Sequence, residues 1–130
     1  QILHRAVTIL DAPPGVACAA VAAIRDADVL VLVTEPTPFG LHDLELAVTL
    51  GRDMGIPLGV VINRDSEGGA DIAGFCEREG IPVLARIPFK RRIAEIYADG
   101  GLVIDEHPEG AAWCTALWAA VRERAEEAEW

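Results

Sequence analysis

Several residues able to bind a phosphate or a metal ion follow the first apolar run of this sequence. Asp11 closes that run, and Pro13, Pro14 and Gly15 come directly after it. A carboxylate at a strand tip can hold Mg²⁺ through water, because this hard cation prefers oxygen ligands and keeps much of its hydration shell. The prolines restrict φ, and glycine lets a backbone pass close to a phosphate. The alternative is an aspartate that caps the next helix, followed by an ordinary proline loop.

Two further polar residues follow later apolar runs. Asn63 follows the third run, and its side chain offers an acceptor and two donors, which suits the paired edge of a purine base. The same side chain could close an Asx turn. Glu35 follows the second run and precedes a proline-rich turn. His42 has no second histidine at a metal-ligand spacing, which favours a surface or hydrogen-bonding role.

The elements that must position these residues are four short apolar runs. They are rich in β-branched residues and do not alternate with polar ones, as in strands buried on both faces of a parallel sheet. The predicted strands are residues 7–10, 29–33, 58–62 and 83–87. Ligands of open α/β sheets lie beyond the carboxyl ends of the strands. We therefore expect Asp11, Gly15, Glu35, Asn63 and Phe89 to share one edge of the sheet.

The segments between these runs carry a helical pattern. Leu41, Leu44, Val48 and Gly51 form a stripe that can pack a helix on the sheet, and a last amphipathic helix begins near residue 108. Gly-Ile-Pro occurs at residues 55–57 and again at 80–82, with glycine where a helix ends and proline where a strand begins. The sequence thus predicts an α/β class, a doubly wound and mainly parallel sheet, formed by residues 1–130 as a single domain.

Composition excludes several classes of function. The formal net charge is −10, which argues against a nucleic-acid surface and against an anionic membrane as partner. No apolar run approaches the roughly 18 residues that cross a bilayer, and no secretory signal is recognisable, so the expected compartment is the cytoplasm. Cys18, Cys76 and Cys114 are widely separated, and we expect them to be buried free thiols.

Four stretches taken together resemble one family, the MinD/ParA-type P-loop ATPases, within the branch that carries an inserted ferredoxin domain. They occur in the family's order and cover most of residues 6–100: ILDAPPGVAC (9–18), VTEPTPFGLHDLELAV (33–48), VVINR (60–64) and GIPVLARIPF (80–89). Each stretch alone is weak evidence, and the ordered set is specific.

The resemblance implies roles for individual residues. Asp11 would be the Walker-B-like aspartate linked to Mg²⁺, and residues 12–15 the switch segment that senses the γ-phosphate of ATP. Asn63 would contact adenine, with Pro88 and Phe89 in the loop that encloses the base. Glu35 would lie near both the nucleotide and the partner of a homodimer formed by the full-length protein.

The glycine-rich phosphate loop of this family, with its lysines, is absent from the sequence, as is the ferredoxin insertion. The chain therefore resembles the C-terminal portion of such an ATPase, and we expect ATP hydrolysis in the full-length protein and not in this chain alone. The ferredoxin-containing branch implies a role in iron–sulfur or metallo-centre maturation or in electron transfer, and allows an iron–sulfur cluster in the missing insertion. The alternative is a non-catalytic α/β interaction module that has lost its nucleotide site.

Loss of the phosphate-loop strand would leave residues 7–10 and 29–33 without the neighbour they share in the family. We expect the gap to close by direct pairing of these two runs, or to be filled by another copy of the chain.

Overall fold

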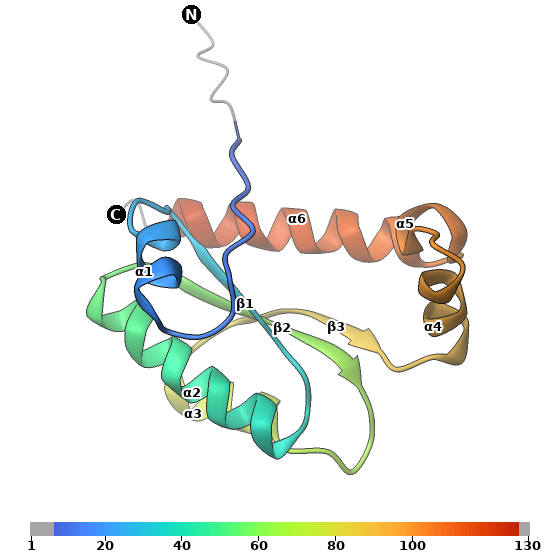
Figure 1. Ribbon diagram of the computed structural model, residues 1–130, viewed down its shortest axis with the longest axis horizontal. Coiled ribbons are helices and arrows are strands. Elements are labelled where there is room, and N and C mark those ends of the chain that lie inside the picture. The colour runs from blue at the N-terminus through green and yellow to red at the C-terminus, as the bar shows by residue number, and fades with distance from the viewer. Residues whose placement is uncertain (1–6, 128–130) are drawn as a thin grey trace, which may run out of the picture.

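A parallel sheet flanked by helices forms the centre of the computed structural model, which describes residues 7–127 (Figure 1). The elements are, in order, α1 (Cys18–Ile24), β1 (Leu30–Thr34), α2 (Pro38–Asp53), β2 (Leu58–Asp65), α3 (Ile72–Glu79), β3 (Val83–Pro88), α4 (Arg91–Ala98), α5 (Val103–Glu106) and α6 (Gly110–Glu127). The three strands lie in the order β1-β2-β3, and both neighbouring pairs are parallel. The predicted α/β class with a parallel sheet is confirmed.

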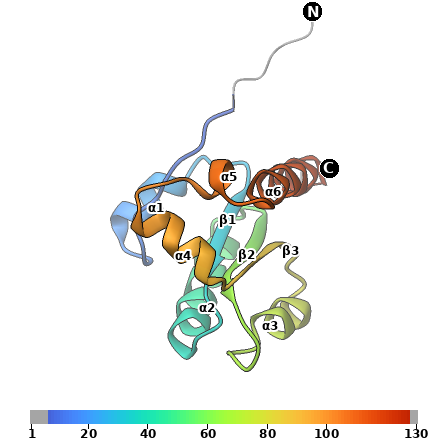
Figure 2. The same cartoon turned by 90° about the vertical axis from the view of Figure 1, so that its right-hand side faces the viewer.

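The central strand β2 carries the hydrophobic core because it has a neighbour on each side. Leu58, Val60 and Ile62 are buried and share one face of the sheet. Helices α2 and α3 cover this face with six buried or nearly buried apolar side chains, from Leu41, Leu44, Val48, Ile72, Phe75 and Cys76. Helix α6 lies across the opposite face, so helices flank the sheet on both sides (Figures 1 and 2).

The junctions between helices and strands follow from local sequence. Gly80 ends α3 with φ of 67°, a left-handed conformation that glycine adopts without steric cost. Thr37 and Asp71 begin α2 and α3, and each side chain accepts a hydrogen bond from the backbone N–H three residues later. These signals fix where the loops after β1 and β2 end and α2 and α3 begin.

The prediction of a strand at residues 7–10 is wrong for this chain. The segment has no regular secondary structure, and Val7, Ile9 and Leu10 are exposed, Ile9 to 83%. Direct pairing of this segment with β1 is likewise not found. An apolar run becomes a strand only where a neighbour accepts its backbone hydrogen bonds, and none of the described residues does so. Filling of the gap by another copy stays a prediction.

The three cysteines differ in exposure. Cys76 is buried under the sheet, as expected, whereas Cys18 and Cys114 are exposed, so the prediction was wrong for these two. Helix α1 turns only Ala20 and Ile24 inward, which leaves Cys18 on its outer side.

No helix within residues 7–127 is long and apolar enough to cross a bilayer.

Candidate functional site

The carboxyl ends of the three strands are joined by one arginine. Arg64, near the end of β2, places Nη1 3.8 Å from Oε1 of Glu35, which follows β1. The guanidinium carbon of Arg64 also lies 5.2 Å from the centre of the Phe89 ring, which follows β3. Two residues predicted to lie at this edge, Glu35 and Phe89, are therefore brought together here through Arg64.

The backbone of β2 is irregular where Arg64 lies. Arg64 has φ of 51°, and among residues 7–127 it is the one non-glycine residue with positive φ. The register with β3 shifts between Ile62 and Asp65, where the regular strand pairing is interrupted. Beyond the shift the two strands pair again, since Asp65 lies opposite Pro88 and its carbonyl accepts the Phe89 N–H at 2.9 Å. A bulge of this kind re-aims side chains at the end of a strand.

Asn63 and Pro88 also lie at this edge. Asn63 is half-buried in β2, directly before Arg64, and Pro88 is the last residue of β3. Of the eight predicted site residues, these two join Glu35 and Phe89 at one edge of the sheet. The arrangement offers an amide, a carboxylate, a guanidinium and an aromatic ring within three adjacent strand ends.

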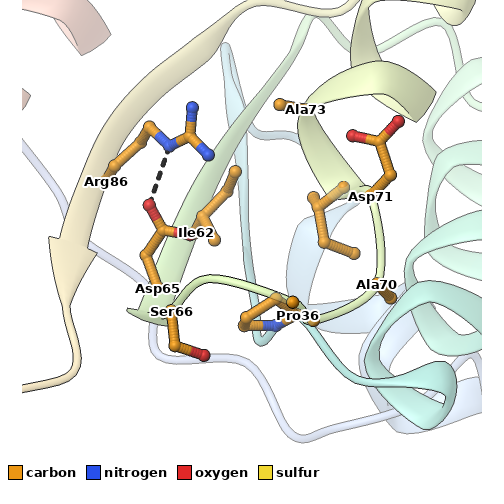
Figure 3. A pocket seen from close by; sticks show the side chains of 11 residues that line it. Pro36, Ile62, Asp65, Ser66, Ala70, Asp71, Ala73 and Arg86 are labelled. Atoms are coloured by element: carbon orange, nitrogen blue, oxygen red, sulfur yellow. Dashed lines mark hydrogen bonds and ion pairs between the residues drawn. The ribbon is translucent and has the colours of Figure 1, made fainter.

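A small polar hollow of about 170 Å³ lies beside the site, between the loop after β2 and the start of α3. The Arg86 side chain donates to Asp65 at 2.9 Å on one wall, and Asp71 lies on the other (Figure 3). Ligand pockets for drug-sized molecules are usually larger than about 300 Å³. The hollow is thus too small to enclose a whole nucleotide, and the candidate site is an open edge.

The four remaining predicted residues, Asp11, Pro13, Pro14 and Gly15, are not brought to this edge. They are exposed and lie in the irregular segment that leads into α1. Figure 1 shows this deep blue segment beside α1, apart from the arrowheads of β2 and β3. Asp11 was expected at the tip of a strand formed by residues 7–10. These residues form no strand, so Asp11 is not held at the carboxyl edge of the sheet.

The described residues offer few grouped donors for a metal ion. Within residues 7–127 no three His, Cys, Asp or Glu side chains are grouped so as to hold a metal ion. The three cysteines are free thiols that belong to no such group. By themselves, the described residues therefore fit neither a self-contained Mg²⁺ site nor an iron–sulfur cluster.

Sequence reasoning missed Arg64, Asp65 and Arg86 as members of this edge. Arg64 appeared only as the last letter of the VVINR stretch, and β2 extends three residues beyond the predicted run. The available signal was the polar triplet at residues 63–65 after an uninterrupted apolar run. The ring contact of Arg64 depends on its left-handed backbone, which no sequence pattern indicated.

The chain is similar in sequence to parts of two longer known proteins. No protein-family model matches the chain. An uncharacterized protein from Methanocaldococcus jannaschii is 34% identical over 94 residues, which cover 72% of this chain and 32% of that protein. An iron-sulfur cluster carrier protein from Aquifex aeolicus is 28% identical over 78% of this chain and 32% of its own length. The chain thus spans about a third of the length of the curated relatives it matches.

Two solved structures are similar to this chain in fold. The cell division ATPase MinD of Pyrococcus furiosus superposes with a TM-score of 0.71 over 87% of this chain and 50% of that one, at 25% identity. The MinD cell division protein of Aquifex aeolicus superposes with a TM-score of 0.67 over 86% of this chain and 50% of its own, at 16% identity.

Proposed function

Because the chain has the MinD/ParA-type P-loop fold, we propose that it supplies the base-recognising part of an ATP-dependent nucleotide switch. The observation that carries the proposal is the convergence of Glu35, Asn63 and Phe89 on the carboxyl edge of a parallel sheet. Ligands of open α/β sheets bind at this edge. The half of the MinD chain that this protein does not match would supply the remaining parts.

In this proposal the residues of the edge have separate tasks. The Asn63 amide donates to and accepts from the paired edge of adenine, which fixes the base by two hydrogen bonds. Phe89 offers a ring for stacking, and Pro88 holds the backbone that carries it. Glu35 faces the nucleotide and a second subunit of the complete protein, which we propose to be a homodimer.

The phosphates must be bound by groups outside this edge. Lys90 is the one lysine of the sequence, and no glycine-rich phosphate loop accompanies it. Backbone N–H groups and lysines of such a loop supply most of a phosphate site. Hydrolysis is accordingly proposed for the longer protein, with positioning and charge stabilisation as its means. The assignments of Asp11 to Mg²⁺ and of residues 12–15 to the γ-phosphate stay predictions.

The relative named as an iron-sulfur cluster carrier supports a finer proposal about the pathway. We propose that the complete protein acts in iron–sulfur or metallo-centre maturation. Electron transfer is the alternative role. The test is whether the longer protein binds a reconstituted cluster and transfers it to an acceptor apoprotein in a manner that depends on ATP.

The nucleotide proposal is tested by titrating the 130-residue chain with Mg-ATP. We expect a dissociation constant in the millimolar range or weaker, because the charge-assisted phosphate contacts are missing. Amide shifts followed by NMR should concentrate at residues 35, 63 and 89, and Asn63→Ala should abolish them. Arg52→Ala is the control, since Arg52 pairs with Glu79 where α2 and α3 end, and should leave the shifts unchanged.

Two results would contradict this proposal. Micromolar affinity would mean that the main phosphate contacts are within this chain and that the site has been misplaced. No nucleotide-dependent shift at the carboxyl edge, at any concentration reached, would favour the non-catalytic interaction module instead.

A further inference from the structure

Arg64 covers the surface on which a base should stack. A base that hydrogen-bonds to Asn63 on β2 and stacks on Phe89 after β3 must lie between these two strand ends. The Arg64 guanidinium lies over the Phe89 ring, with its carbon 5.2 Å from the ring centre, on the face where such a base would stack. Both side chains are accessible, since Phe89 is 57% exposed and the Arg64 side chain 56% exposed. The contact is therefore at the surface, where a ligand can reach it.

The contacts that hold Arg64 in this position are long. Its ion pair with Glu35 spans 3.8 Å, which is near the limit for such a pair. Exposed ion pairs and exposed cation–π contacts are each weak interactions. The backbone at Arg64 is also left-handed, a conformation that costs energy for a residue with a Cβ and that is found more often at functional sites than elsewhere.

We propose that Arg64 is a displaceable cover of the base-stacking face of Phe89, and thereby sets the affinity of the site for a nucleobase. The inference rests on the proposed nucleotide function. Stacking of a base on an aromatic ring is stronger than an exposed cation–π contact, so a purine replaces the guanidinium on Phe89. Glu35 can keep its charge pairing with Arg64 as the guanidinium moves aside, because Glu35 follows β1, on the side of β2 away from Phe89.

The experiment is an NMR titration of the 130-residue chain with adenosine, which lacks phosphates and so removes the direct effect of charge on binding. Arg64→Ala removes the cover, and we expect adenosine to bind about two- to fivefold more tightly, the equivalent of one exposed cation–π contact. Phe89→Ala should abolish the shifts at residues 63–65. Unchanged or weaker binding by Arg64→Ala would overturn the proposal, because it would show that the guanidinium does not compete with the base.

A second substitution separates the side chain from the backbone. Arg64→Gly removes the same guanidinium and also relieves the left-handed strain, whereas alanine retains that strain. Equal tightening by both variants is expected, and tightening by glycine alone would overturn the proposal in favour of loop relaxation. Arg52→Ala, at a paired surface arginine far from the edge, should bind adenosine as the unchanged chain does.

The failures of the two proposals are distinguishable. If adenosine shifts the amide signals of residues 63–65 and 89 with the same affinity in the unchanged chain and in Arg64→Ala, only the proposal for Arg64 is wrong. If adenosine shifts none of these residues in any variant, the nucleotide function fails and the cover with it.

Discussion

Asp71 is the residue that starts α3, the helix that closes the core beside the candidate site. Its Oδ1 accepts the Gly74 N–H at 2.8 Å, which satisfies one of the free N–H groups at the helix start. We expect Asp71→Ala to lower the free energy of unfolding by about 1 kcal/mol, the usual value of a helix cap. Urea unfolding measures the change. Asp71→Ser is the control, and a loss as large as that of alanine would show that capping is not the cause.

Cys76 gives the stability a dependence on alkaline pH. Burial raises the pKa of its thiol above the ordinary value of 9.0. In the unfolded chain the thiol ionises at its ordinary pKa while the folded chain still holds the proton. Stability from this group is therefore complete below about pH 9 and is lost as the pH rises toward the folded pKa.

The measurement is urea unfolding at about pH 8 and about pH 10, where one such proton is worth at most about 1.4 kcal/mol per pH unit. Cys76→Ala is less stable at both values but should lose less stability between them. Equal losses in the two proteins would mean that the Cys76 thiol ionises as readily in the folded state. The exposed Cys18 and Cys114 are present in both and cancel in the comparison.

At the scale of elements, β2 differs from β1 because it has two neighbours and two covering layers. Val60 in β2 is 0% exposed, whereas Val33 in β1 is 66% exposed. We expect Val60→Ala to destabilise the protein by about 2 kcal/mol, from lost burial and the cavity left behind. The same substitution at Val33 should change stability by less than about 0.5 kcal/mol. Thermal or urea unfolding of both variants tests the pair, and similar losses would contradict the assignment of β2 as the central strand.

At the scale of the whole molecule, β1 presents an edge without a neighbouring strand among the described residues. Val33 is an exposed residue of this edge strand. Val7 and Ile9, which precede it in the sequence, are exposed apolar residues as well. Unpaired strand edges promote association between chains. We expect the 130-residue chain to associate as its concentration rises, and Val33→Lys to suppress this, because a charge on an edge strand opposes pairing.

Light scattering over a concentration series measures the association. Leu46→Lys is the control, since Leu46 is an exposed apolar residue of α2 and lies on no strand edge. It should leave the association unchanged. A chain that stays monomeric at every concentration, or equal effects of the two lysines, would contradict a role for the β1 edge.

Sequence by itself determined the features that depend on near neighbours along the chain. The runs that became β1, β2 and β3, the stripe of Leu44 and Val48 on α2, and the glycine that ends α3 follow from periodicity and φ preference. These are local properties, because a strand buried on both faces needs a continuous apolar run and a helix end favours a residue free to adopt positive φ. For the same reason Asn63 and Phe89 could be placed at strand ends in advance.

Tertiary structure alone decided which of the patterned segments found partners. Residues 7–10 have the composition of a buried strand, yet strand formation depends on a neighbouring edge that the sequence of the segment does not contain. The contact of Arg64 with Glu35 and Phe89 was decided in the same way. It requires three strand ends, a register shift and a left-handed backbone to coincide, and each of these arises from packing between segments distant in sequence.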